Sequence, residues 1–243
     1  MNTFALILIV LVASTLQAAT GFGFAIMAIP FLLLLFESHD AIQLNIILSL
    51  IISLLMIYRV RHEINIEMLK RLTLGSLVGI IPGLILFILF DVRPLKMFVS
   101  IVIIAIASLL VANIKFKQSN IKELFVGAFS GFLTTSIGMP GPPLMIYFAG
   151  ARVDKATIRA TTVAYFVVVS LVSLALQFSF YNTSVVVWRS TLWSIPCILV
   201  GTLLGQWIFT RMNQRLLQKI IYLLLFFTGI YLLISTLFSF VKQ

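Results

Sequence analysis

Long apolar stretches separated by short basic clusters constrain the fold of this chain more than any other feature. A helix needs about 20 apolar residues to cross a membrane. Soluble domains carry about 25% charged residues, whereas this chain of 243 residues has 10% charged and 61% hydrophobic residues. The sequence therefore predicts an all-α polytopic membrane protein with one transmembrane domain over residues 1–243. The apolar stretches run roughly over 3–36, 41–58, 69–90, 95–114, 121–149, 157–180, 184–210 and 216–240.

Two of these stretches contain a break. As a single helix, residues 3–36 would be about 51 Å long, and Thr20-Gly21-Phe22-Gly23-Phe24 interrupts them; we call this the first break. The second break, Gly138-Met139-Pro140-Gly141-Pro142-Pro143, interrupts residues 121–149. It cannot be continuous helix, because proline lacks the N–H donor and clashes with the preceding turn. The first break could also be a kink, and the second a loop at the membrane edge.

The two breaks begin similar halves of the chain. Gly138 follows Gly21 by 117 residues, and later in each half Leu-Val-Gly-x-x-x-Gly recurs, at 77–83 and 199–205. Small residues at this spacing are common where membrane helices pack closely. We expect close packing, not ligand binding, at Gly75, Gly79, Gly83, Gly201 and Gly205. The sequence thus predicts two repeats, residues 1–115 and 120–243, each a broken hairpin followed by three transmembrane helices.

The distribution of basic residues predicts the topology. If each broken stretch turns back as a hairpin, thirteen of the 17 Lys and Arg residues share one side, whereas single crossings would split them nine to eight. Cytoplasmic loops carry the excess of Lys and Arg, so the hairpin model is favoured. Each half then has three full spans, and the second half is inverted relative to the first. The expected cytoplasmic loops are 59–71, 115–122, 152–159 and 211–219, with both termini outside.

Inverted repeats with broken helices place the binding site of many transporters near the bilayer midplane. The first turn of a helix has free N–H groups with partial positive charge, which attract anions. Pro142 and Pro143 suit such a first turn. We therefore expect a small anion to bind where two opposed hairpins meet. The expected binding residues are Gln17, Thr20, Gly21, Phe22, Gly23, Thr134, Thr135, Ser136, Gly138, Met139 and Gly141. The alternative role for the polar ones is to satisfy backbone groups freed by the breaks.

Other polar residues are candidates for the transport pathway. Asn45 and Ser49 lie one turn apart, and Thr162 has a similar place in the second half. Hydrogen bonding between helices is their alternative role. Arg159, near the start of a span, could attract anions from the cytoplasm or extend to the lipid headgroups.

Several functional classes lack support in the sequence. The net charge of +10 resides in the clusters between apolar stretches, so we expect a lipid bilayer and no nucleic acid as partner. His39 and His62, expected in loops, have no cysteine or carboxylate cluster at metal spacing, and no catalytic motif is present. We therefore expect no enzyme activity, no metal and no cofactor.

The residues of both breaks resemble the paired motifs of the bacterial TauE/SafE sulfite exporter family. The resemblance covers nearly the whole chain in length, duplicated halves and motif placement. It implies a multi-pass permease of the cytoplasmic (inner) membrane that exports sulfite, sulfoacetate or a related organosulfur anion. An anion channel of the same architecture is the alternative, and a lipid-modifying membrane enzyme is a third. The resemblance leaves open the particular anion, coupling to a proton or other ion, and the oligomeric state.

Overall fold

The structure is a computed structural model that describes residues 3–89, 119–150 and 153–211 and, between these ranges, residues 94, 101 and 105. Every regular element in these ranges is a helix, which confirms the predicted all-α class. The elements are α1 (Thr3–Thr20), α2 (Phe24–Leu35), α3 (Ser38–Val60), the 3-10 helix η1 (Arg61–Glu63), α4 (Ile66–Leu89), α6 (Asn120–Ile137), α7 (Gly141–Gly150), α8 (Lys155–Phe180) and α9 (Val185–Arg211).

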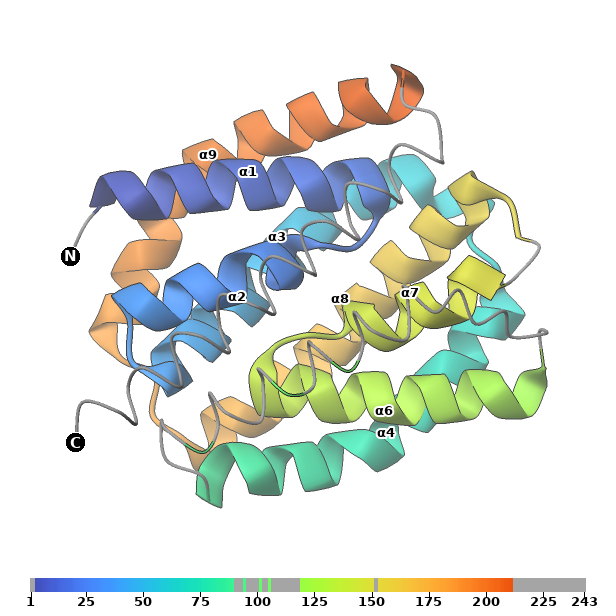
Figure 1. Ribbon diagram of the computed structural model, residues 1–243, viewed down its shortest axis with the longest axis horizontal. Helices are drawn as coiled ribbons and strands as arrows, with labels where there is room; N and C mark the ends of the chain where they lie inside the picture. Colours follow the sequence, from blue (N-terminus) through green and yellow to red (C-terminus); the bar gives the residue numbers. More distant parts are fainter. Residues whose placement is uncertain are drawn as a thin grey trace.

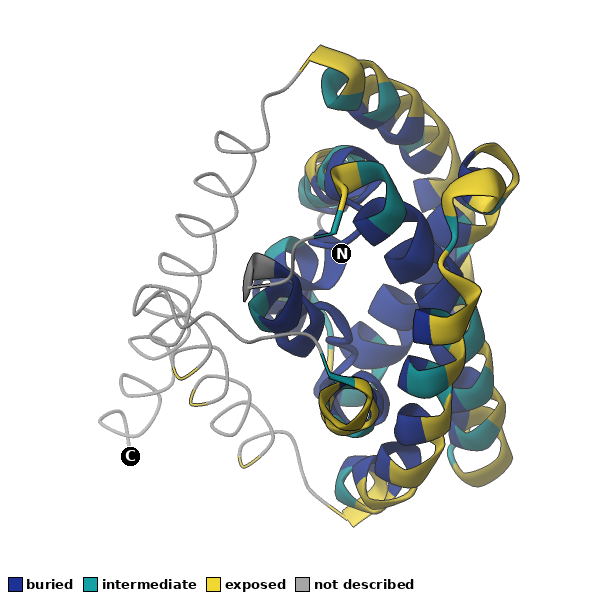
Figure 2. Ribbon diagram, turned by 90° about the vertical axis from the view of Figure 1, so that its right-hand side faces the viewer, coloured by how far each residue is buried: buried dark blue, intermediate teal, exposed yellow. Residues whose placement is uncertain are grey.

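Five of these helices are long and apolar enough to cross a membrane, namely α1, α4, α8, α9 and the continuous segment formed by α3 and η1. Many large apolar side chains on their outer faces are exposed, such as Val78, Leu89 and Val185. Figure 2 shows the buried residues turned inward and the exposed ones outward. This distribution fits a surface that faces lipid. Apart from residues 101 and 105, the expected spans 95–114 and 216–240 lie outside the described residues.

Each broken stretch forms a helical hairpin. α2 turns back along α1 after the first break, and α7 turns back along α6 after the second, as Figure 1 shows. The two hairpins point in opposite directions in this view. The prolines of the second break lie where the sequence predicts, since Pro142 and Pro143 are the second and third residues of α7. His39, expected in a loop, lies in α3, because that helix already begins at Ser38.

Glycines allow the backbones of α9 and α1, and those of α4 and α6, to approach each other closely. A Cβ added at Gly201 would lie 2.9 Å from the backbone oxygen of Leu11, and one at Gly205 would collide with that of Thr15. On the other pair, a Cβ at Gly79 would collide with the oxygen of Ala128, and one at Gly83 would lie 2.5 Å from that of Phe132. Gly75 approaches Leu124 in the same way. The prediction that these five glycines are packing residues is therefore confirmed.

The two helix pairs use equivalent positions. Ala128 and Phe132 follow Leu11 and Thr15 by 117 residues, the offset of Gly138 from Gly21. Between the two pairs, α3 packs against α8, and α8 begins 117 residues after α3.

Basic side chains gather at one end of the molecule. The end of α3, the beginnings of α4, α6 and α8 and the end of α9 lie together at the right of Figure 1. Only Arg189, near the start of α9, belongs to the opposite end among the Lys and Arg residues of the described ranges. The others are Arg59, Arg61, Lys70, Arg71, Lys122, Lys155, Arg159 and Arg211.

Candidate substrate site at the two helix breaks

The two breaks open with the same backbone turn. Gly21 has a φ of 84° and donates its N–H to the Gln17 oxygen at 2.7 Å. Gly138 has a φ of 73° and donates to the Thr134 oxygen at 2.8 Å. This is the left-handed cap that commonly ends a helix, and it favours glycine because a side chain there meets the backbone. In each half the next helix begins three residues later.

The breaks lie in contact with each other. A Cβ added at Gly141 would lie 3.5 Å from the Cβ of Phe22 and 3.8 Å from Cδ1 of Ile26 and Cζ of Phe166. The beginnings of α2 and α7 are therefore neighbours. The same distances are ordinary van der Waals contacts, and φ of Gly141 is not positive. Gly141 thus has room for a side chain, which distinguishes it from Gly21 and Gly138.

The two helix beginnings differ in the donors that they offer. The residue before α2 and the first three residues of α2 are Gly23, Phe24, Ala25 and Ile26, and all have an N–H group. No side chain caps this helix end. The corresponding residues of α7 are Pro140, Gly141, Pro142 and Pro143. Three of these four are prolines, so α2 presents far more unpaired N–H donors to a ligand than α7 does.

The three hydroxyl groups that precede the second break, at the end of α6, donate to the backbone of their own helix. Thr134 donates to the Ser130 oxygen at 2.6 Å and Ser136 to the Phe132 oxygen at 2.7 Å. The hydroxyl of Thr135 bonds the Gly131 oxygen and also lies 2.8 Å from the Ser173 hydroxyl. All three hydroxyls have partners within the protein, so an anion would have to compete for their protons.

Thr20 stabilises the first break in a similar way. Its hydroxyl lies 2.9 Å from the Leu16 oxygen and accepts the Phe22 N–H at 3.0 Å. The N–H groups of Gly21 and Phe22 are therefore already satisfied inside the break. The free donors begin at Gly23, the residue before α2.

Gln17 and Ser49 come together between α1 and α3. The Gln17 amide donates to the Ser49 backbone oxygen at 3.1 Å and the Ser53 hydroxyl at 3.0 Å, and the Ser49 hydroxyl donates back to Gln17 at 3.0 Å. All three residues are buried. This network supports the alternative role of helix–helix hydrogen bonding for Ser49, and Gln17 takes part in it instead of bonding the backbone of the break.

Asn45 and Thr162 retain unpartnered polar atoms in the interior. Asn45 donates to the Gly138 oxygen at 2.8 Å, but its own oxygen has no partner. The hydroxyl of Thr162, completely buried on α8, has none either. Nearby, the N–H of Met139 is satisfied by the Leu133 oxygen at 3.1 Å. Unsatisfied buried groups are costly, and in native proteins they often bind water or a ligand.

Arg159 is buried at the first break, which differs from the headgroup position that was one of its two predicted alternatives. Its Nε and Nη2 donate to the Ala18 oxygen at 3.0 and 2.6 Å, and its guanidinium lies 4.1 Å from the centre of the Phe209 ring. A Cβ added at Gly21 would lie 2.9 Å from the Cα of Arg159. The side chain does not extend to lipid, because the end of α1 covers the first turn of α8.

Some buried interactions have no signal in the sequence. Glu123 forms an ion pair with Arg71 and accepts the Tyr147 hydroxyl at 2.8 Å. Ser130 donates to the Pro140 oxygen at 2.6 Å and so holds the second break. These contacts link positions with no common motif, and only the fold brings them together.

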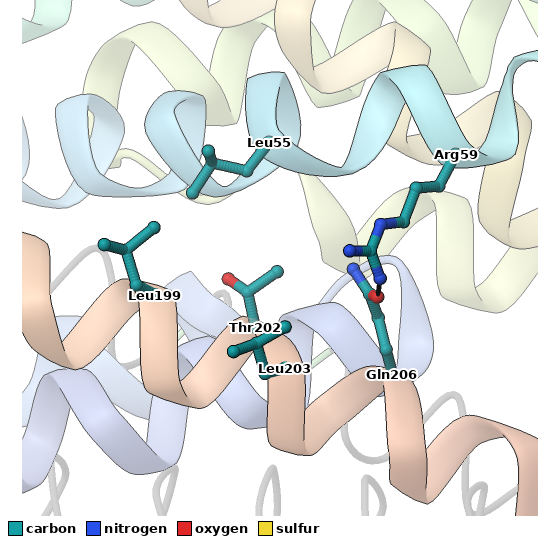
Figure 3. A pocket seen from close by; sticks show the side chains of 6 residues that line it. All are labelled: Leu55, Arg59, Leu199, Thr202, Leu203 and Gln206. Carbon is teal, nitrogen blue, oxygen red and sulfur yellow. Dashed lines mark hydrogen bonds between the residues drawn. The ribbon is translucent and has the colours of Figure 1, made fainter.

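A pocket of about 140 Å³ opens between α3 and α9, and none of its lining residues belongs to a break (Figure 3). Arg59 and Gln206 form a hydrogen bond at one end of it. Its remaining lining residues are Leu55, Leu199, Thr202 and Leu203.

A bundle of long apolar helices with two broken hairpins in contact defines the class as a multi-pass membrane protein of transporter type. The chain matches the family described as Sulfite exporter TauE/SafE over residues 6–232, and it belongs to that family. Membership makes it a membrane transport protein, since the proteins of this family are transporters. No curated protein and no solved structure matches it.

Proposed function

We propose that the protein is a secondary transporter that exports a small sulfur oxyanion or sulfonate, such as sulfite or sulfoacetate, across the bacterial inner membrane. The observation that carries this proposal is the contact of Gly141 with Phe22 in a member of a sulfite exporter family. Irregular backbone at membrane depth is tolerated where protein buries it or where it lines a cavity. Two such breaks in contact provide a small region with helix beginnings and buried polar groups.

We further propose that residues 1–115 and 120–243 are inverted repeats that rock against each other around this region. Three features support the proposal. The left-handed caps at Gly21 and Gly138 are alike, the helix pairs α1–α9 and α6–α4 use equivalent residues, and the two hairpins point in opposite directions. Alternating access in inverted-repeat transporters proceeds by rocking of one repeat against the other.

Binding to purified protein tests the choice of substrate. A ligand of the folded state stabilises it by about 2.7 kcal/mol at a hundredfold excess over Kd. We expect sulfite or sulfoacetate to raise the thermal unfolding temperature in a saturable manner, and sulfate, thiosulfate and taurine to show which oxyanion features matter. An absence of any saturable shift with all five compounds would contradict the proposed substrate class.

Flux through proteoliposomes then separates a transporter from a channel. A transporter exposes its site to one side at a time, so efflux of labelled sulfite should saturate and accelerate when unlabelled sulfite is present on the opposite side. A current whose reversal potential follows the sulfite gradient, without such exchange, would instead establish a channel.

A further inference from the structure

We propose that Arg159 supplies the positive charge that holds the transported anion, and that the anion binds at the first break instead of being shared equally by both. This inference rests on the proposed function and deepens it. The site then consists of more than helix ends. When the anion binds, the Arg159 guanidinium gives up its hydrogen bonds to the Ala18 oxygen and binds the anion instead.

The first argument is the free-energy cost of burying the positive charge of Arg159 without an ion pair. The residue is 8% exposed, and the ion pairs among the described residues join Arg71 to Glu67 and Glu123, so none involves Arg159. The Glu63 carboxylate also acts on the charge of Arg159, but from beyond ion-pair distance. One backbone oxygen and an aromatic ring do not replace a paired carboxylate for a group with five N–H donors. Ionisable side chains inside membrane proteins are costly and usually serve a function.

The second argument is a difference between the two halves. Arg159 follows Ile42 by 117 residues, and both residues pack against the cap glycine of a break. A Cβ at Gly21 would meet Arg159, whereas one at Gly138 would lie 3.4 Å from the Ile42 oxygen. Equivalent places in the two halves thus hold a cation in one case and an apolar side chain in the other.

The donors of the helix beginnings favour the same break. The start of α2 presents N–H groups from Gly23 to Ile26 without a side-chain cap, whereas prolines remove most of them from the start of α7. A helix beginning and a buried arginine then act on one anion. The planar guanidinium can bind two oxygens of a sulfite or sulfonate group at once, which a halide cannot match.

An unpartnered hydroxyl gives independent evidence for a ligand. On α8, Arg159 lies against the position of the missing Cβ of Gly21, and Phe166 faces that of Gly141. Thr162 lies between them, one turn after Arg159 on the same helix face. Its hydroxyl is fully buried and has no partner. A third donor is therefore available between the two breaks.

The test measures affinities for sulfite and sulfoacetate by calorimetry, with full-length protein in lipid nanodiscs. We expect Arg159→Gln to weaken binding at least tenfold and Arg159→Lys to weaken it less, because lysine keeps the charge but loses the planar fork. Lys155→Gln is the matched control: it removes an equal charge one turn earlier, beside the same Phe209 ring. It should change affinity less than twofold.

Thr162→Val separates a ligand group from a structural one. Valine has the shape of threonine without the unpartnered hydroxyl, so the unliganded variant should unfold at the same or a higher temperature. Its affinity for sulfite should nevertheless fall severalfold. A lower unfolding temperature with unchanged affinity would assign the hydroxyl to the fold.

The outcomes distinguish this inference from the proposed function. If the natural protein binds sulfite and folded Arg159→Gln binds it equally well, Arg159 only caps α1, and the inference is overturned while the transporter proposal stands. Should Arg159→Gln fail to fold, the results for Arg159→Lys and Thr162→Val decide: native affinity in both overturns the inference. If the natural protein binds neither anion, the proposed substrate class fails first.

Discussion

At the residue scale, backbone geometry separates glycines that resemble each other in sequence. Gly21 and Gly141 both lie in breaks, and the sequence alone suggests close approach of a ligand at both. Only Gly21 has a positive φ, and only Gly21 has backbone atoms of a neighbouring helix against the position of its missing Cβ. The requirement for glycine at Gly21 therefore comes from the turn and from Arg159, whether or not a ligand is bound.

Substitution by alanine at these two glycines should give opposite results. Gly21→Ala combines left-handed backbone, which costs about 1–2 kcal/mol, with a Cβ that would lie 2.9 Å from the Cα of Arg159. We expect a clear loss of thermal stability in detergent. Gly141→Ala adds a methyl group at ordinary contact distances of 3.5–3.8 Å and should leave the unfolding temperature nearly unchanged. Equal losses in the two variants would show that the turn at Gly21 is not the cause.

At the scale of elements, the glycine contacts explain how α4 and α6 pack. Helices in a membrane associate through van der Waals packing and not through the hydrophobic effect, so small residues let the backbones approach. Gly79 and Gly201 have equivalent places in the α4–α6 and α1–α9 pairs, and each faces a backbone oxygen, although the Ser14 hydroxyl lies still nearer to Gly201. An oxygen of the main chain cannot rotate away as a side chain can, so a new methyl group must separate the helices.

We therefore expect Gly79→Ala and Gly201→Ala to destabilise the protein by roughly 1–3 kcal/mol, as overpacking does. This loss outweighs the gain of about 0.5–1 kcal/mol that alanine brings to a helix interior. The control is Val78→Ala, at a residue that is 70% exposed beside Gly79. The stabilities of the three variants are compared by thermal unfolding in the same detergent. Stability of Gly79→Ala at or above that of Val78→Ala would refute this account of the packing.

The sequence predicted those features that depend on local rules. Proline and glycine identified both breaks, the position of Pro142 and Pro143 in a first turn, and the packing role of Gly79 and Gly201. The burial of Arg159 was not predictable, because the sequence shows only a basic residue beside Lys155 and gives no sign that the end of α1 covers it. Nor does any pattern reveal whether a threonine such as Thr134 bonds its own helix or a ligand.

At the scale of the whole molecule, charge orients the protein in the membrane. With the exception of Arg189, the basic residues of the described ranges belong to helix ends that lie together in Figure 1. An excess of Lys and Arg marks the cytoplasmic side. The end that carries Arg59 and Lys122 should therefore face the cytoplasm, and the first hairpin should enter from outside.

Labelling of single cysteines tests this orientation. In a Cys197→Ser background, which removes the one native thiol, we place cysteine at Asn2 or at Ser119 and treat intact cells with a thiol reagent that cannot cross the inner membrane. Asn2→Cys should react, since the distribution of basic residues predicts that the N-terminus lies outside, and Ser119→Cys should react only after the cells are opened. Ser119 directly precedes α6, whose first turn carries Lys122. Reaction at Ser119→Cys but not at Asn2→Cys in intact cells would reverse the whole assignment.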